Sequence, residues 1–294
     1  MSRALTIDHL SNTYPNGVRA LHDVSLRIPT GMFGLLGPNG AGKSTLMRII
    51  ATLQEPDAGS VGLGDLDVLR EKDRVRRLLG YLPQEFGVYP RVTAQAMLSH
   101  LAALKGVPPR QVRETVEALL RQTNLWDERK RRLDTFSGGM KQRFGIAQAL
   151  LGDPQLIIVD EPTAGLDPTE RLRFHNLLSQ IGENIVVILS THIVEDVSDL
   201  CSRMAIISKG EVLLTGEPAD AIERLDGRVW SRVVGREELA GYERDHHVIS
   251  TRLSGGRTVI HVYADERPGD GFERVRTELT DVYFSTLKRA AVAA

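Results

Sequence analysis

A glycine-rich segment that ends in a lysine and two hydroxyl residues is the first part of the sequence able to do chemistry. It reads Gly-Pro-Asn-Gly-Ala-Gly-Lys-Ser-Thr over residues 37–45 and matches the pattern G-x-x-x-x-G-K-[ST]. An apolar run, 33–36, precedes it, and a helical pattern follows from Leu46, as the motif requires. Glycines carry no Cβ, so backbone N–H groups can converge on phosphate oxygens, and the following helix adds its positive end. The segment therefore predicts a site for the phosphates of a nucleotide.

Two residues of this loop have separate predicted roles. The Lys43 ammonium is expected to reach the β- and γ-phosphates, and the Ser44 hydroxyl to ligate Mg²⁺. A glycine turn that carries Lys-Ser by coincidence is the alternative, and the correct flanks on both sides argue against it. The pattern alone does not separate an ATPase from a GTPase or a kinase. The residues predicted to bind the nucleotide are Gly37, Pro38, Asn39, Gly40, Ala41, Gly42, Lys43, Ser44 and Thr45.

A second apolar run ends in two acids. Residues 156–159 read Leu-Ile-Ile-Val, and Asp160 and Glu161 follow directly. Ligands collect at the carboxyl ends of parallel strands, so Asp160 is predicted to hold Mg²⁺, directly or through water. Glu161 is predicted to polarise the water that attacks the γ-phosphate. Alone, this pair would indicate a solvated loop after a core strand; the phosphate loop favours the catalytic interpretation.

Two other polar residues follow predicted strands and complete the γ-phosphate end of the site. His192 comes after the apolar run 185–189 and is predicted to contact the γ-phosphate. Gln84 follows a short strand and is predicted to ligate the metal and to report an occupied Mg–phosphate site to the neighbouring helices. Considered alone, each would be interpreted as an ordinary loop residue. Their positions directly after predicted strands favour a role in the site for both.

Composition and charge narrow the class of protein. The chain has 294 residues, of which 41% are hydrophobic and 26% charged, which is ordinary for a globular protein with a sizeable core. A formal net charge of -1 gives no electrostatic reason to expect a nucleic-acid partner. The single cysteine, Cys201, excludes an intramolecular disulfide, and its apolar neighbours indicate a small buried side chain.

No segment of the sequence has the pattern of a membrane span or a signal peptide. The longest apolar runs, 156–159 and 185–189, have the length of buried strands and fall far short of the ~20 residues that cross a bilayer. We therefore expect a soluble chain. If it serves a membrane process, another polypeptide has to supply the membrane part.

The elements that position these residues are those of an α/β protein. Residues 5–7 and 24–28 alternate apolar and polar side chains, which predicts half-exposed antiparallel strands at the start. The runs at 33–36, 156–159 and 185–189 are nearly all apolar, which is typical of parallel strands buried on both faces. A closing hairpin is predicted for 204–208 and 212–214, with Lys209-Gly210 as its turn.

Two further regions interrupt or extend this core. Between about 92 and 152 no strand pattern appears, and 94–105 and 110–122 have helical periodicity, which predicts an inserted helical subdomain at about 86–152. After about residue 220 the pattern changes, with a strand at 258–263 and a helix candidate at 272–279. We expect a nucleotide-binding domain over 1–220 and a small α+β extension over 221–294, which packs against the core because it would be marginal alone.

The segment that opens the helix after 137 names a family. Residues 135–143 read Thr-Phe-Ser-Gly-Gly-Met-Lys-Gln-Arg, which resembles the LSGGQ signature of the ABC ATPases. The phosphate loop, Gln84, Asp160-Glu161, the run Ala-Gly-Leu-Asp ending at Asp167, and His192 occur in that family's order. The resemblance covers residues 1 to about 220 and sets aside GTPases and metabolite kinases, which lack the signature.

The resemblance implies an architecture as well as an activity. The fold would be a RecA-like P-loop NTPase core with an antiparallel β subdomain and a helical subdomain, working as a head-to-tail dimer with ATP and Mg²⁺. Ser137, Gly138 and Gly139 of one subunit would cap the ATP bound by the other, since a helix N-terminus suits an anion. Asp167 would lie at the dimer seam, and Tyr14 matches the aromatic residue that stacks on adenine.

Two features depart from or imitate the family pattern. Phe136 and Met140 replace the Leu and Gln of the signature, so a glutamine contact is lost, while the serine and glycines remain. A second Leu-Ser-Gly-Gly, at 253–256, comes after the catalytic strands and is followed by a strand pattern, so a hairpin turn is the better interpretation.

The function that these motifs predict is an ATP-hydrolysing motor of an ABC membrane transporter. Its partners would be an integral membrane subunit and a second ATPase subunit, held on the inner face of the cell membrane, with no nucleic acid. The segment 85–90 would carry motion to the membrane subunit. The end of the chain, 278–287, resembles ABC-2 type exporters of drugs, antibiotics and polysaccharides. The alternatives are a soluble ABC ATPase acting on ribosomes or DNA, and a regulatory ATP-binding protein without turnover.

Overall fold

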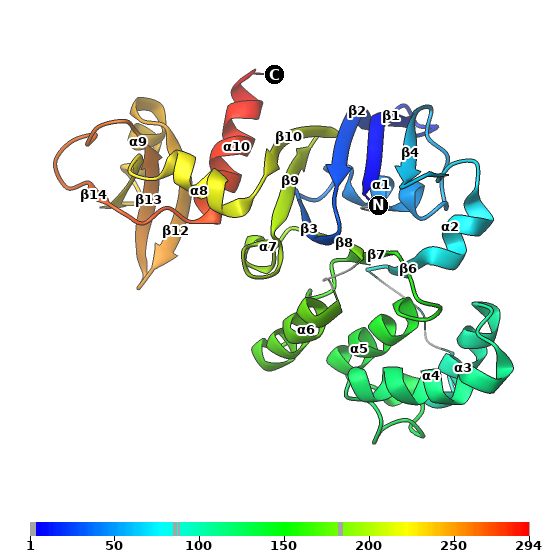
Figure 1. Cartoon of the computed structure of the whole chain (residues 1–294). Helices are drawn as coiled ribbons and strands as arrows, with labels where there is room; N and C mark the ends of the chain where they lie inside the picture. The colour runs from blue at the N-terminus through cyan, green and yellow to red at the C-terminus, as the bar shows by residue number, and fades with distance from the viewer. Residues whose placement is uncertain (1–3, 85–86, 88, 182–184, 294) are drawn as a thin grey trace.

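The computed structural model describes residues 4–84, 87, 89–181 and 185–293. Three β-sheets organise the described residues, and helices cover or separate them (Figure 1). Within these described residues, no helix combines the length and apolar character that a membrane crossing requires. The predicted coupling residues Glu85, Phe86 and Val88 lie outside the described part of the chain.

An antiparallel sheet begins the chain, in the order β2-β1-β4-β5. Its register pairs Leu5 with Ile28 and Ile7 with Leu26, and these side chains are buried, whereas Thr6 between them is half-buried and Arg27 is exposed. The predicted alternation of apolar and polar residues is confirmed. The strands are β1 (Leu5–Thr13), β2 (Arg19–Ile28), β4 (Ala58–Leu63) and β5 (Leu66–Asp67).

The central sheet has six strands in the order β10-β9-β3-β8-β7-β6 and is parallel except for β10. All five residues of β7 and all six of β8 are buried, as predicted for apolar runs covered on both faces. The predicted closing hairpin is confirmed as β9 and β10. The strands are β3 (Gly31–Leu36), β6 (Leu79–Leu82), β7 (Leu156–Asp160), β8 (Val186–Thr191), β9 (Arg203–Ser208) and β10 (Glu211–Gly216).

Hydrophobic cores form on both faces of this central sheet. On one face, Leu35 and Ile188 join side chains of α1 and of the antiparallel sheet. On the other, Leu36 and Leu189 join side chains of α6 and α7. The helices beside the sheets are α1 (Lys43–Ile50), α2 (Lys72–Leu78), α6 (Pro168–Ile181) and α7 (Val194–Leu200).

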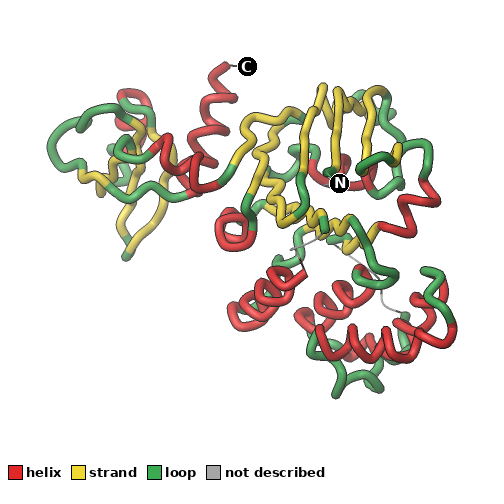
Figure 2. The backbone as a smooth tube through the Cα atoms, viewed as in Figure 1, coloured by secondary structure: helices red, strands yellow, loops and turns green. Residues whose placement is uncertain are grey.

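Between β6 and β7 the described chain consists of helices and loops without a strand (Figure 2). Helix α3 (Ala94–Leu104) is capped by Thr93, and α4 (Pro109–Gln122) starts with a proline at its first position. A short 3₁₀ turn (Leu133–Thr135) leads to α5 (Gly138–Ala149). These elements bury their own hydrophobic core, so the predicted helices at 94–105 and 110–122 are confirmed.

The last part of the chain forms a third sheet, in the order β12-β13-β11-β14, to one side of the central sheet (Figure 1). Its final helix, α10, packs against β12 of this sheet and also against α7 and α8, where Val282 and Tyr283 enter the core of the central sheet. The elements are α8 (Pro218–Leu225), β11 (Val229–Val234), α9 (Leu239–Asp245), β12 (Val248–Ser254), β13 (Arg257–Tyr263), β14 (Glu273–Arg274) and α10 (Leu279–Ala293).

The helix predicted for 272–279 is wrong. This segment is extended, with β14 pairing to β11 and the helix starting only at Leu279. Phe272 is buried in the core of the third sheet, whereas Val275 and Leu279 pack with the core of the central sheet. The spacing of these three residues is that of one helical face. Their side chains nevertheless enter two different cores, and an extended segment is long enough to reach both.

The second Leu-Ser-Gly-Gly segment is a hairpin turn, as predicted. It joins β12 to β13, with Leu253 paired to Thr258 across the strands. Gly255 and Gly256 both have positive φ, which a tight two-residue turn between antiparallel strands requires.

Candidate nucleotide-binding site

The phosphate loop occupies the turn between β3 and α1. Gly42, just before the helix, has φ 104°, and a Cβ there would lie 2.5 Å from the Ala20 carbonyl oxygen. A Cβ on Gly37 would lie 2.4 Å from the Ile207 carbonyl oxygen. Glycine is therefore needed at both ends of the loop because neighbouring backbone comes too close for any side chain.

A cavity of about 590 Å³ opens beside this loop. It brings together Tyr14, Gln84, Glu161 and His192, which come from four separate parts of the chain, with residues 38–45 of the loop. Asp160 is buried next to Glu161 at the end of β7. The structure therefore gathers the predicted phosphate, water and γ-phosphate residues at one edge of the central sheet.

Lys43 is almost completely buried, with 6% of its surface exposed. Its Nζ donates hydrogen bonds to the carbonyl oxygens of Gly37 (2.6 Å) and Pro38 (3.3 Å) and lies 3.6 Å from Glu161 Oε1. Burial lowers the pKa of this ammonium, and the negative charges of Glu161 and Asp160 oppose the decrease. The lysine is thus held inside the loop by backbone oxygens and by the carboxylate of Glu161.

Asp160 has the environment of a metal ligand. Its carboxylate is buried, and Oδ1 makes no hydrogen bond with any described residue. Burial and the nearby charge of Glu161 raise the pKa of Asp160, while the Ser190 hydroxyl, the Lys43 charge and the Ser44 hydroxyl act against the rise. An unpaired buried oxygen beside the Ser44 hydroxyl, with the Gln84 amide in the same site, is a set of hard donors that suits Mg²⁺.

Glu161 and His192 contact each other directly. Nδ1 of His192 donates to Glu161 Oε2 at 2.7 Å, and Thr191 Oγ1 lies 3.5 Å from the same oxygen. The Glu161 side chain is 6% exposed, whereas His192 lies at the surface of the cavity. The backbone N–H of Glu161 donates to Ser190 at the end of β8, so two adjacent strands fix the pair.

Tyr14 lines the cavity next to Thr45 of the loop. Its hydroxyl lies 2.8 Å from Thr45 Oγ1, and its backbone N–H donates to Val18. Arg19 and Lys209 also line the cavity, and the motif analysis did not single them out for nucleotide binding. Lys209 appeared there only as a hairpin turn residue, and its nearness to the loop comes from pairing between distant strands.

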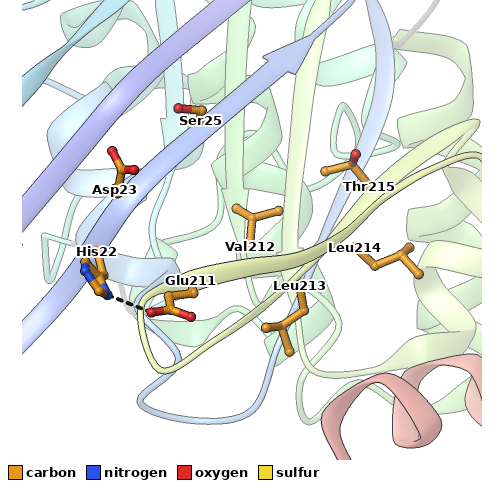
Figure 3. Close-up of a pocket in the computed structure, with 8 residues that line it drawn as sticks. All are labelled: His22, Asp23, Ser25, Glu211, Val212, Leu213, Leu214 and Thr215. Carbon is orange, nitrogen blue, oxygen red and sulfur yellow. Dashed lines mark hydrogen bonds and ion pairs between the residues drawn. The ribbon is translucent and has the colours of Figure 1, made fainter. Parts of the chain in front are cut away.

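The β9–β10 hairpin holds the phosphate loop from the side. Gly210 N–H donates to the Ala41 carbonyl of the loop at 2.9 Å, and His22 N–H donates to Gly210. His22 and Glu211 join their side chains across this seam at 2.6 Å (Figure 3). A separate groove of about 530 Å³ lies between β2 and β10, lined by the residues drawn in Figure 3, and none of them belongs to the phosphate loop.

The signature residues do not line this cavity. Ser137 is the N-cap of α5, where its Oγ accepts from Met140 N–H at 3.2 Å, and Gly138 is exposed beside it. Gly139 is buried, with Glu170 so close that a Cβ would overlap the carboxylate. Asp167 is exposed and accepts from Glu170 N–H at the start of α6.

The two departures from the signature pattern pack inside the helical region. Phe136 contacts Phe144 in an edge-to-face arrangement with ring centroids 6.5 Å apart. Met140 packs against the same core. These residues therefore pack the start of α5 against the core of the helical region, while Ser137 and Gly138 remain at the surface.

Comparisons with known proteins identify the relatives of this chain. Residues 21–164 match the model of the "ABC transporter" family. An uncharacterized ABC transporter ATP-binding protein, YxlF of Bacillus subtilis (strain 168), is 34% identical over 84% of this chain and 81% of its own length. The Nod factor export ATP-binding protein I of Rhizobium etli is 36% identical over 84% of this chain and 76% of its own. Methionine import ATP-binding proteins of Bacillus species match as well.

A solved structure is similar in three dimensions. It is the dimer of an ATP-binding cassette in a post-hydrolysis state, bound to ADP and phosphate. It has a TM-score of 0.66 and 26% sequence identity, and the match covers 72% of this chain and 98% of the cassette.

Proposed function

This chain belongs to the ATP-binding proteins of ABC transporters, and we propose that it is the motor subunit of a membrane exporter. Its fold is that of the P-loop NTPases, and it is an ATP hydrolase. The proposed mechanism adds the residue roles, the head-to-tail dimer, the membrane partner and the direction of transport. The 1–220 and 221–294 division into a nucleotide-binding domain and an accessory domain is part of the same proposal.

The observation that carries the catalytic part is the position of Glu161. Its buried carboxylate lies between Lys43 and His192, at 3.6 and 2.7 Å, at the edge of the cavity that the phosphate loop forms. In the proposed reaction Glu161 accepts the proton of the attacking water, and His192 holds the γ-phosphate. Lys43 and the loop N–H groups bind the phosphates, and Tyr14 stacks on the adenine. Mg²⁺, when bound by Asp160, Ser44 and Gln84, supplies charge neutralisation at the β- and γ-phosphates.

The signature residues, which do not line this cavity, are the basis for proposing a dimer. Ser137 and Gly138 stand exposed at the N-terminus of α5, a 12-residue helix whose N–H groups suit an anion. In a head-to-tail dimer, the Ser137, Gly138 and Gly139 segment of one subunit would complete the γ-phosphate site of the other. Asp167, exposed at the start of α6, would lie at the seam.

We place the docking site of the proposed membrane partner in a groove on this chain. A hollow of about 440 Å³ lies where α3 and α5 meet β6, and the exposed side chains of Leu53 and Leu104 form part of its lining. Arg76 and Arg77 line it as well. We propose that a short cytoplasmic helix of the membrane subunit, with an apolar face and an acidic residue, occupies this groove.

Export is the proposed direction because of the Nod factor export relative and the resemblance of 278–287 to exporter subunits. Methionine import relatives show that the core alone is compatible with either direction. The chain would therefore sit at the inner face of the cell membrane through its partner.

Glu161→Gln tests the catalytic assignment. The amide cannot accept the proton, so we expect ATP turnover to fall by about 100-fold or more while ATP still binds. We also expect ATP to trap the variant as a dimer, measured by size-exclusion chromatography, and Ser137→Arg in the same background to abolish the dimer. Turnover at the wild-type rate would remove Glu161 from the role of base.

The same variant tests the partner. Tagged Glu161→Gln protein, purified from solubilised membranes with ATP present, should recover a multi-span protein without a phosphate loop of its own. Recovery of ribosomal or DNA-bound proteins in its place, with nothing from the membrane, would contradict the transporter role.

A further inference from the structure

The loop that carries Glu161 has a strained backbone. Glu161 has φ 49°, in the left-handed region that a residue with a long side chain rarely adopts. Such a conformation persists only where surrounding contacts hold it, and residues in such conformations cluster at functional sites. The bond from Glu161 N–H to Ser190 fixes the loop at its beginning. A second contact holds the loop beyond Glu161.

Asp196 supplies that contact from another element. It lies on α7 and has 0% of its surface exposed. Its Oδ2 accepts a hydrogen bond from the hydroxyl of Thr163, which is buried two residues after Glu161. The loop is thus held on both sides of the strained residue, first by β8 and then by α7.

The other oxygen of Asp196 binds α6. Oδ1 accepts from Arg171 Nε and from His175 Nε2, each at 2.8 Å, and Arg171 Nη2 lies at 2.8 Å as well. One buried carboxylate therefore joins the Glu161 loop, the helix that follows Asp167, and the helix that follows His192. Such a group costs free energy to bury and is a weak argument for stability, so a role in fixing geometry accounts for it better.

We propose that Asp196 is a positioning residue for ATP hydrolysis. By holding the Thr163 hydroxyl, it keeps the loop in the conformation that directs the Glu161 carboxylate towards the attacking water. It also keeps α7, and with it His192, in register with that carboxylate. Asp196 touches neither ATP nor water itself. This inference rests on the proposed role of Glu161 as base.

Thr163→Val removes the hydroxyl and keeps the shape of the side chain, and Thr163→Ser keeps the hydroxyl. We expect kcat of the valine variant to fall by about 10- to 100-fold, with KM for ATP within about two-fold, since the phosphate loop is untouched. The serine variant should recover most of kcat. A merely structural bond would lower the melting temperature and leave kcat unchanged at temperatures where both variants are folded.

Asp196→Asn should show the same loss of kcat, with Glu195→Gln as the matched control, because Glu195 is an exposed acid one position earlier. If Asp196→Asn does not fold, the comparison of Thr163→Val with Thr163→Ser still tests the proposal. A Thr163→Val enzyme with wild-type kcat would overturn the proposal.

Combining Thr163→Val with Glu161→Gln tests whether the effect passes through Glu161. If it does, the double variant should turn over ATP no more slowly than Glu161→Gln alone, measured in single turnovers. Multiplied losses would overturn the proposal, because Thr163 would then act independently. A Glu161→Gln enzyme of normal activity would instead refute the role of Glu161 as base, so the two failures are distinguishable.

Discussion

At the scale of single residues, the site depends on buried charges that compensate one another. Lys43, Asp160 and Glu161 are each at least 94% buried, and isolated burial of any of them would be costly. The contacts of Lys43 with Glu161 and with backbone carbonyls offset that cost. Removing one member therefore leaves its partner buried and unpaired, so a loss of activity has to be interpreted together with a measurement of folding.

The residue types of this site could be predicted from the sequence, but the contacts that hold the Glu161 loop in place could not. The phosphate loop, the two acids and His192 could be predicted because each follows an apolar strand in a recognisable motif. Asp196 could not, since its significance comes from three contacts with Thr163, Arg171 and His175. The positive φ of Glu161 also leaves no trace in the sequence, because it is imposed by the surrounding structure.

Cys201 gives a residue-scale prediction about pH. Burial raises the pKa of its thiol, and the negative charge of Asp196 adds to the rise. The folded protein therefore retains this proton where the unfolded chain loses it, so the stability contributed by the thiol is present below pH ~8.5 and is lost as pH rises above that value. We expect alkylation by iodoacetamide at pH 8 to be far slower in the folded protein than in urea. Equal rates in the two states would contradict the burial of Cys201.

At the scale of elements, the backbones of β6 and α5 come so close together that only glycine fits at position 80. Gly80 on β6 lies against α5, where a Cβ would come within 2.1 Å of the Ala149 carbonyl oxygen. The helical region contacts the central sheet here, so the glycine sets the distance between the two.

Gly80→Ala should therefore be destabilising. The overlap is with backbone, which cannot rotate away, so we expect the free energy of unfolding to fall by about 1–3 kcal/mol, measured in urea. Gly62→Ala in β4 is the control, because its Cβ would meet nothing closer than 3.8 Å, and we expect a change within about 0.5 kcal/mol. Equal effects of the two changes would refute the close packing at Gly80.

The elements themselves were largely predictable, and the exception is instructive. The helices at 94–105 and 110–122 followed from periodicity because each packs one face against one core. The strands at 33–36 and 156–159 followed from short, nearly continuous apolar runs, because each strand is buried on both faces. Residues 272–279 have the spacing of a helical face, yet they are extended and send side chains into two cores. The spacing of apolar residues is the same whether they form one helical face or enter two separate cores. The pattern therefore predicted a helix where the chain is extended.

At the scale of the whole molecule, the groove at Leu104 gives a prediction about coupling. Leu104 is 71% exposed, so Leu104→Asp should leave folding and the ATPase rate of the isolated subunit unchanged. With an acid facing the proposed membrane helix, co-purification with the membrane subunit should be lost. Leu253→Asp, at an equally exposed leucine of the third sheet, is the control. Loss of the partner in the Leu253 variant alone would place the docking surface elsewhere.

The packing of α10 has a consequence for the order in which the chain can fold during its synthesis. Val197 and Leu225 share a core with Val282 and Tyr283, which the ribosome adds much later. At 5–20 residues per second, the interval between Leu225 and Tyr283 lasts roughly 3–12 s. Through that interval every catalytic motif has been made while an apolar face of the ATPase core lacks its cover. A chaperone that binds nascent chains would find its substrate there, and the finished helix would displace it.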